Sequence, residues 1–388
     1  MMTQKEYPRI VSQPKYSFFL FGPRGVGKSS WLRKMFPETL YINLLEEKTY
    51  QTILADPEQF TLRLATLKRG DTVVLDEIQR LPNLLNEIHR HIEERGLRFV
   101  MSGSSARKLR RAGTNLLGGR AIRKELFPLT REELGEDFTL SHVMNYGSLP
   151  LIWTTEGDRE VLETYVQTYL KEEIQAEALV RNLPGFARFL PVAALFNSSV
   201  LNAAALSRDA GVSRTTVLGY LDILDDTLLT FRLPAYEGRL RVKEKRHPKL
   251  YWSDPGIVRA TKKTFGPPAP EEYGHLFESW LVSVLRAYRS YRNLFDDWNY
   301  WAPTENSRLE VDLLLWRGKE CLAIDIKSSK KYRSEFSKGL RALNENWKGK
   351  KPTRNVIIYL GSERLKTSEG FEVLPLTQFL DLIEQGQL

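Results

Sequence analysis

Cysteine and histidine are scarce in this 388-residue sequence, which contains one cysteine, Cys321, and five histidines. A single cysteine cannot form a disulfide within the chain, and this suits a reducing compartment such as the cytoplasm. The histidines are scattered, and no group of Cys and His residues has the spacing of a zinc site. The sequence is therefore not that of a disulfide-stabilised scaffold, and nothing in it predicts bound zinc.

Long apolar runs are also missing. No stretch of roughly 18 or more consecutive apolar residues, the length of a membrane-spanning helix, occurs in the sequence. The opening segment, MMTQKEYPRIVSQPKY, lacks the apolar core of a signal peptide. We therefore expect a soluble, cytoplasmic protein with no membrane partner.

The overall composition is that of an ordinary globular protein, with 42% hydrophobic and 27% charged residues. The net charge of +9 is unevenly distributed. Residues 98–124 carry +8, residues 232–249 carry +5 and residues 327–351 carry +7, which leaves −11 for the rest of the chain. Three basic segments in an otherwise acidic chain favour a surface that faces nucleic acid. Three separate basic faces exposed to solvent would give the same pattern.

A phosphate-binding loop follows the first apolar segment. Residues 16–21, YSFFLF, are typical of a strand, and GPRGVGKS at 22–29 has the pattern G-x-x-x-x-G-K-[S/T] in front of a helical segment. In this pattern the lysine reaches the terminal phosphates and the Ser hydroxyl ligates Mg²⁺. The predicted ATP-binding residues are Gly22, Pro23, Arg24, Gly25, Val26, Gly27, Lys28, Ser29 and Ser30.

Two acidic residues close a second strand. Residues 72–77, TVVLDE, form a β-branched run that ends in Asp76 and Glu77. Residues at the carboxyl ends of strands point into the ligand crevice of a doubly wound sheet. We therefore expect Asp76 to hold the magnesium ion with Ser29, and Glu77 to orient or deprotonate the attacking water.

Residues 40–44 and 98–101 supply two further strands. Ser102 and Ser104 follow the second of them, where a polar side chain can sense the γ-phosphate. Serines are also common turn residues, so both interpretations stay open.

These segments resemble the AAA-type ATPases, and more narrowly a prokaryotic family that joins such a domain to a C-terminal region related to PD-(D/E)XK nucleases. The resemblance rests on GPRGVGKS, VVLDEIQ, FVMSGSSA, GGRAIRKELFPLT and YGSLP, and it covers most of the chain. It implies a homo-oligomeric ring, such as a hexamer, in which an arginine of one subunit completes its neighbour's ATP site. Arg120 is the first candidate for this catalytic arginine, with Arg107, Arg110 and Arg111 as rivals, because that basic run also suits a nucleic-acid pore.

The middle of the chain reads as a helical connector followed by a helix–turn–helix. Residues 160–181 have the apolar spacing of a helix, at the place of an ATPase lid. In residues 201–224, Gly211 marks a tight turn and Ser213 caps a second helix. The basic segment that follows reads as a β-hairpin wing, although winged helices also bind proteins. Predicted DNA contacts are Arg214, Thr215, Thr216, Arg241, Lys243 and Lys245, with Lys330 and Lys331 in the third basic segment.

The C-terminal third carries acids and a lysine in a definite order: Glu278 on a helix, Asp312 within a strand, and Asp325 and Lys327 at the end of the next strand. This order matches the PD-(D/E)XK pattern. We therefore predict a second magnesium site at Glu278, Asp312 and Asp325, with Lys327 on the face of Asp325 to activate water. Domains of this type also bind the phosphate backbone without cleaving it.

The predicted architecture is a multidomain α/β chain. Residues 1–138 form an AAA-type P-loop domain with a parallel sheet, 139–194 a helical lid, 195–262 a winged helix–turn–helix, and 263–388 a PD-(D/E)XK-like α/β domain. The leading functional hypothesis is an ATP- and Mg²⁺-dependent oligomeric motor that remodels or translocates duplex or branched DNA. The alternatives are an ATP-regulated DNA nuclease of a defence or repair system, and a signalling ATPase whose C-terminal modules bind proteins.

Overall fold

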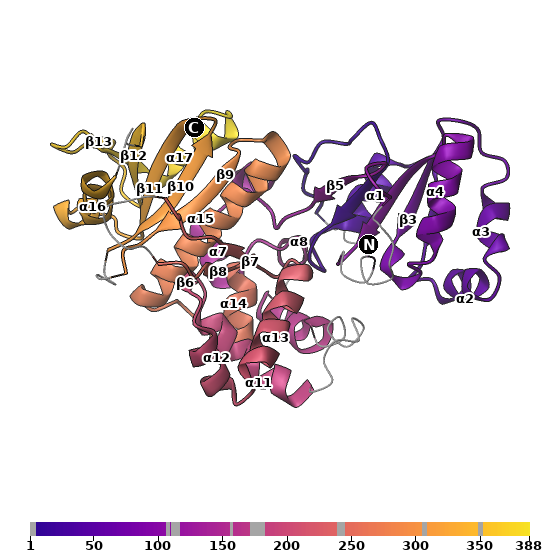
Figure 1. Cartoon of the computed structure of the whole chain (residues 1–388), viewed down its shortest axis with the longest axis horizontal. Helices are drawn as coiled ribbons and strands as arrows, with labels where there is room; N and C mark the ends of the chain where they lie inside the picture. The colour runs from indigo at the N-terminus through magenta and orange to yellow at the C-terminus, as the bar shows by residue number, and fades with distance from the viewer. Residues whose placement is uncertain are drawn as a thin grey trace.

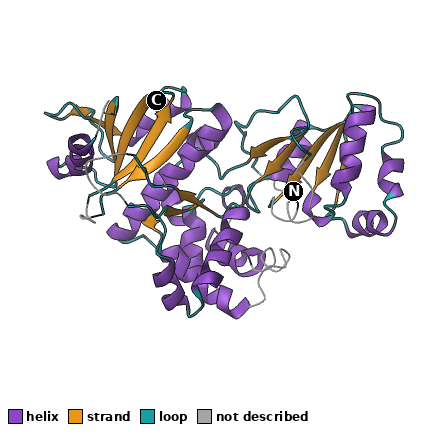
Figure 2. Cartoon of the chain, viewed as in Figure 1, coloured by secondary structure: helices purple, strands orange, loops and turns teal. Residues whose placement is uncertain are grey.

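The computed structural model describes residues 5–105, 109, 117–155, 158–170, 183–238, 245–304, 309–347 and 352–388. Figure 1 shows the N-terminal domain at one end of the molecule, a C-terminal sheet at the other, and a group of helices in the lower part of the view. Three separate sheets are visible in Figure 2. Within the described ranges, every helix is too short or too polar to cross a membrane.

The N-terminal domain is built on a five-stranded parallel sheet with the order β2-β3-β4-β1-β5. Its three central strands, β3, β4 and β1, are buried, as expected for apolar runs covered on both faces, while the edge strands β2 and β5 are more exposed. The strands are β1 (Phe18–Phe21), β2 (Leu40–Asn43), β3 (Thr72–Asp76), β4 (Arg98–Gly103) and β5 (Ile122–Glu125), and the helices are α1 (Lys28–Met35), α2 (Glu47–Ala55), α3 (Glu58–Arg63) and α4 (Leu84–Arg95), with a 3-10 turn at Ile78–Arg80.

This sheet confirms the predicted parallel P-loop fold. Because β1 lies between β4 and β5, and β3 pairs with β4, the loop after β1 and the acids at the end of β3 reach the same edge of the sheet. That edge is where ligands bind in open α/β sheets.

The middle of the chain is mainly helical. It contains α6 (Arg131–Leu134), α7 (Leu140–Tyr146), α8 (Pro150–Trp153), α9 (Asp158–Thr164), a π-helical segment (Tyr165–Leu170), α11 (Leu183–Leu195), α12 (Ala203–Ala210), α13 (Arg214–Asp226) and α14 (Pro255–Lys262), with a 3-10 turn at Gly135–Asp137. A three-stranded sheet, β6-β8-β7, is formed by β6 (Ser199–Val200), β7 (Thr230–Leu233) and β8 (Lys249–Trp252). The helix predicted over 160–181 is present as far as residue 170, and its remainder lies outside the described residues.

The two helices of the predicted helix–turn–helix are α12 and α13. They join at Gly211, whose φ of 63° is a left-handed conformation that suits glycine. The Ser213 hydroxyl accepts a hydrogen bond from the Thr216 amide and caps α13. The tip of the predicted wing, residues 239–244, lies outside the described residues, so the winged helix stays a prediction.

The C-terminal region combines a long helix with a six-stranded mixed sheet of order β13-β14-β12-β11-β10-β9. Its elements are α15 (Pro270–Arg292), β9 (Asp297–Trp301), β10 (Val311–Arg317), β11 (Glu320–Lys327), a 3-10 turn (Ser334–Ser337), α16 (Lys338–Asn346), β12 (Arg354–Tyr359), β13 (Leu365–Lys366), β14 (Glu372–Pro375) and α17 (Leu376–Glu384). One hydrophobic cluster runs from Val143 on α7 to Ile383 on α17. The divisions predicted at 194 and 262 therefore do not coincide with a break in the packing.

The far end of α15 contacts the N-terminal domain. Arg286 pairs with Glu125 at 3.0 Å, while Tyr288 and Arg292 both bind Glu132, at 2.8 and 2.5 Å. The hydroxyl of a further residue of this helix, Tyr291, accepts the amide of Phe127 at 3.0 Å. Side chains of α15 thus contribute to the link between the two ends of the molecule, together with the ion pairs of Arg131 with Asp381 and Glu384 on α17.

A buried carboxylate fixes the YGSLP segment to α14. Asp254 is fully buried, and its side chain accepts hydrogen bonds from the amides of Ser148 at 2.6 Å and Ile257 at 3.1 Å. The helix approaches so closely that a Cβ on Gly256 would lie 2.0 Å from the carbonyl oxygen of Tyr146. The glycine there is a packing requirement.

Replacing Asp254 by Asn should lower the free energy of unfolding by about 1–3 kcal/mol, because the amide NH₂ would face a buried donor. Burial raises the pKa of Asp254 to about 6 from 3.8. The folded state thus holds this proton more tightly, and the associated stability is lost as the pH rises from about 4 to about 6. In thermal unfolding between pH 4 and 8, the melting temperature of the native chain should fall as this stability is lost, and that of D254N should not show this fall. S148A, which loses only the weaker 3.2 Å hydroxyl contact, should keep it.

Candidate functional site

The phosphate-binding loop has the backbone that its sequence predicts. Gly25 and Gly27 have φ values of 77° and 88°, which are strained for any residue with a side chain. Gly27 is the N-cap of α1, so the positive end of that helix and its free amides face the loop. The Lys28 ammonium donates to the carbonyl oxygens of Gly22 at 2.8 Å and Pro23 at 3.2 Å. The arrangement suits a polyphosphate.

Asp76 lies at the end of β3 with its carboxylate held by neighbours on both sides. It is 1% exposed, and it accepts hydrogen bonds from Tyr41 on β2 at 2.5 Å and from Ser102 on β4. Burial, together with the Asp76 carboxylate, raises the pKa of Tyr41, so this hydroxyl stays a donor. A carboxylate held at a strand end by two hydroxyl donors is an oxygen ligand of the kind that magnesium prefers. Sequence reasoning missed Tyr41, and it assigned Ser102 to phosphate sensing or to a turn.

Glu77 has a backbone conformation that is rare for its residue type, with φ of 63°. Its amide donates to the Ser102 hydroxyl at 3.2 Å, and its carboxylate accepts a hydrogen bond from Gln79. Gln79 also donates to Ser104 at 3.3 Å, and its own carbonyl oxygen has no hydrogen-bond partner within the described chain. A Cβ on Gly103 would lie 2.5 Å from that oxygen. Glu77 is therefore positioned by Gln79, whose only sequence signal was its place in the VVLDEIQ segment.

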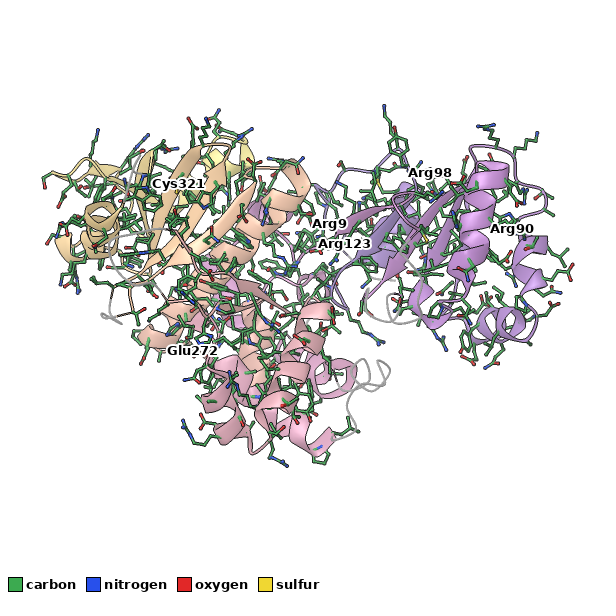
Figure 3. The ribbon with its side chains drawn as sticks, in the orientation of Figure 1. Arg9, Arg90, Arg98, Arg123, Glu272 and Cys321 are labelled. Carbon is green, nitrogen blue, oxygen red and sulfur yellow. The ribbon has the colours of Figure 1, made fainter. Side chains whose placement is uncertain are left out.

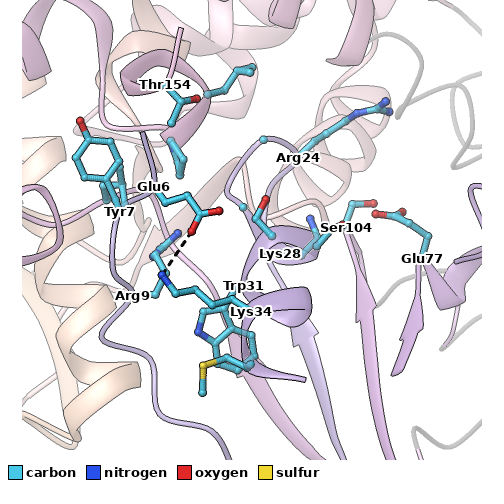
Figure 4. Close-up of a pocket in the computed structure, with 18 of the residues that line it drawn as sticks. Glu6, Tyr7, Arg9, Arg24, Lys28, Trp31, Lys34, Glu77, Ser104 and Thr154 are labelled. Atoms are coloured by element: carbon cyan, nitrogen blue, oxygen red, sulfur yellow. Dashed lines mark hydrogen bonds and ion pairs between the residues drawn. The ribbon is translucent and has the colours of Figure 1, made fainter. Parts of the chain in front are cut away.

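The phosphate-binding loop, Glu77, Gln79 and Ser104 line one cavity of about 880 Å³, a volume suited to a nucleotide. Figure 4 shows Lys28, Ser104 and Glu77 on one side of it, and Glu6, Tyr7 and Arg9 on the other. Residues of α8 complete the lining: Pro150, Leu151 and the adjoining Thr154. The N-terminal segment and α8 carry no sequence motif for a ligand, so the sequence did not assign them to the site.

Arg9 connects this cavity to the rest of the molecule. Its guanidinium forms an ion pair with Glu133 at 2.9 Å, and the two side chains are 6% and 0% exposed. It also donates to the carbonyl oxygens of Val26 at 2.7 Å and Phe127 at 2.5 Å, and lies 3.5 Å from the Tyr291 hydroxyl. In Figure 3, Arg9 lies between the two ends of the molecule. One buried side chain thus contacts the phosphate-binding loop, the segment after β5 and α15.

The predicted catalytic arginine lies on the surface. The side chain of Arg120 is 41% exposed and pairs with Glu93 on α4. Its rivals Arg107, Arg110 and Arg111 lie outside the described residues. Its role in a neighbouring subunit stays a prediction.

The predicted DNA contacts are spread over several surfaces. Arg214 and Thr215 at the start of α13 and Lys330 and Lys331 after β11 are exposed, Lys245 is half-buried, and Arg241 and Lys243 lie outside the described residues. The half-buried Thr216 takes part in the cap of α13. The second basic segment offers less free charge than its sequence suggests, since Arg232 pairs with Asp222 and Asp225 and Lys249 is buried.

The structure brings Glu278, Asp312, Asp325 and Lys327 together. We call the three acids the C-terminal carboxylate cluster. Lys327 binds Asp325 at 2.5 Å and lies 3.9 Å from Asp312. A second lysine that the sequence did not single out, Lys249 on β8, binds Glu278 at 2.9 Å and lies 3.4 Å from Asp312. Although burial lowers it, the surrounding acids raise the pKa of Lys249 well above its usual value.

This arrangement does not fit the predicted second magnesium site. Across the described ranges, no group of three or more His, Cys, Asp or Glu side chains is arranged to hold a metal ion. The physical reason is that ammonium groups already bridge the carboxylates. The sequence signal that could have predicted a lysine among these acids is Lys249 itself, which begins the otherwise apolar strand KLYW.

Comparisons with known proteins agree with the N-terminal geometry. Residues 15–135 match the family model described as AAA domain, while residues 138–267 and 273–379 match two models described as domains of unknown function. The uncharacterized protein Rv2008c of Mycobacterium tuberculosis is 24% identical over 372 residues, covering 93% of this chain and 80% of the relative. The uncharacterized protein MJ1544 of Methanocaldococcus jannaschii is 21% identical over 397 residues, with 94% and 85% covered.

Among solved structures, a mutant of Thermotoga maritima RuvB is 18% identical, with a TM-score of 0.31 over 56% of this chain and 82% of that chain. The family match and the parallel sheet together identify residues 15–135 as an AAA-type P-loop ATPase domain.

Proposed function

We propose that this protein, with its AAA-type domain, is an oligomeric DNA-dependent ATPase that binds and remodels or translocates duplex or branched DNA such as junctions. The observation that carries the ATPase part is the meeting of the phosphate-binding loop and Glu77 at one cavity, with Asp76 beside it at the end of β3. The DNA part is supported by the exposed residues at the start of α13 and after β11.

The roles of the ATP site follow from the positions of its side chains. Loop amides and Lys28 would bind the phosphates, and Ser29 and Asp76 would hold the magnesium ion that accompanies ATP. Glu77 would accept a proton from the attacking water, held in place by Gln79. The hydroxyls of Tyr41 and Ser102 would hold the Asp76 carboxylate in place.

The proposed assembly is a ring, such as a hexamer. It is supported by the exposed position of Arg120. Its side chain is exposed and its partner is another surface residue, Glu93, so it can reach a neighbouring subunit at the cost of one solvated ion pair. Solution mass measurement with and without ATP tests this assembly.

The alternative function, a signalling ATPase, has the same ATP site and differs only in that its C-terminal modules bind a protein and not DNA.

DNA should stimulate ATP hydrolysis saturably, and the affinity should fall steeply between roughly 50 and 200 mM salt because bound phosphates release counterions. The measurement is phosphate release with linear, forked and four-way-junction DNA. Reversing three exposed charges in R214E/K330E/K331E should weaken the stimulation. K48E, which reverses one charge at an exposed position of α2, serves as a control for charge reversal away from these surfaces. Rates unchanged by every DNA at low salt would contradict the proposal and favour a protein partner.

A further inference from the structure

We infer that Lys249 takes the place of a divalent cation in the C-terminal carboxylate cluster, so that this cluster is an internal ion network and not a metal-dependent nuclease centre. The inference is independent of the proposed ATPase, because it concerns only contacts among β8, α15, β10 and β11.

The first support is the position of the Lys249 ammonium. The residue is 1% exposed, and its Nζ lies 2.9 Å from Glu278, 3.4 Å from Asp312 and 3.4 Å from Glu310. An ammonium group has three donors, and here three carboxylates surround it. A magnesium or calcium ion shared by Glu278 and Asp312 would need oxygen ligands at about 2.0–2.6 Å in the same space. The ammonium and the ion therefore exclude each other.

The second support is that each acid of the cluster also has a protein donor other than Lys249. The Tyr251 hydroxyl donates to the same oxygen of Glu278 at 2.6 Å. The second oxygen of Asp312 accepts the amide of Ile326 at 2.8 Å. Asp325 is paired with Lys327. Each of the three acids is thus bound by a protein donor, as buried polar groups must be.

The third support is that Lys249 is fixed by its strand. It pairs with Val200 on β6 and Leu233 on β7 in the central position of the three-stranded sheet. The Nζ also lies 5.6 Å from the centre of the Tyr300 ring. Backbone pairing on both sides therefore holds the Cα of Lys249 beside the cluster. Its ion pairs join the three-stranded sheet to α15 and β10.

Replacing Lys249 by Met should convert the cluster into a divalent-cation site. The nucleotide-free, full-length K249M protein should unfold at a lower temperature than the native chain, because Glu278, Glu310 and Asp312 lose their shared cation. Millimolar Mn²⁺ should restore its melting temperature, and calorimetric titration should show a single bound Mn²⁺. The native chain should show neither response. Adding D312N to K249M should abolish the Mn²⁺ response.

A charge-balanced control keeps the test decisive if K249M fails to fold. In K249M/E278Q the ammonium and one carboxylate are removed together, while the Gln oxygen can still accept from Tyr251. This protein should fold without metal and ignore Mn²⁺. A native chain that binds one Mn²⁺ without nucleotide, and loses it in D325N, would overturn the inference. Mg²⁺-dependent DNA cleavage that disappears in D325N would overturn it too.

Discussion

Replacing Arg9 by Met is expected to destabilise the protein by about 3–5 kcal/mol, the cost of removing one partner from a buried ion pair. Glu133 would remain as an uncompensated charge at 0% exposure, and the carbonyl oxygens of Val26 and Phe127 would lose their donor. Because Val26 belongs to the phosphate-binding loop, R9M should also raise the KM for ATP. Urea unfolding followed by tryptophan fluorescence, with steady-state ATPase assays, measures both effects.

Two matched variants separate the ion pair from the loop contact. R9M/E133Q removes both charges, so it should be more stable than R9M alone. Y291F removes only the hydroxyl that lies 3.5 Å from Arg9 and accepts the Phe127 amide, so it should cost less stability and leave the loop intact. An R9M protein with native unfolding and native KM would show that the buried pair contributes neither to stability nor to the ATP site.

Replacing Glu77 by Gln is expected to lower kcat for ATP hydrolysis by about 10²–10⁴-fold, the usual contribution of a general base. The amide has the shape of the acid and keeps an oxygen that can accept from Gln79, but it cannot take a proton from water. Nucleotide affinity should change little, because the phosphates are bound by the loop and Lys28. Single-turnover phosphate release and binding of a fluorescent ATP analogue separate the two quantities.

E58Q, at an exposed position of helix α3, is the control for the loss of one negative charge. It should hydrolyse ATP at the native rate. If E77Q also turned over at the native rate, water would be activated elsewhere in the cavity, and the assignment of Glu77 would be wrong.

The sequence predicted those parts of the fold whose signals are local. The parallel sheet follows from short apolar strands separated by helices, and the ATP site follows from a glycine-rich loop and from acids at a strand end. The helix of α15 and the order of Glu278, Asp312 and Asp325 are likewise local patterns.

The residues that sequence reasoning missed act across long separations. Arg9 meets Glu133 over 124 positions, and Tyr41 meets Asp76 over 35. Lys249 belongs to a basic segment that reads as a DNA-facing wing, yet packing turns it inward onto α15 and β10. Such partners depend on tertiary contacts that no periodicity or motif encodes.

The helix α15 has a mechanical consequence for the molecule. Glu278 in its first half is bound to Lys249, and Tyr291 in its last turn contacts Arg9 and, through it, the phosphate-binding loop. With a rise of 1.5 Å per residue these two points are about 20 Å apart on one rigid rod. A tilt of ~3° about either end therefore shifts the other by ~1 Å, on the scale of a hydrogen bond's tolerance. A movement of α15 would therefore change the contacts of the C-terminal carboxylate cluster and those of Arg9 together.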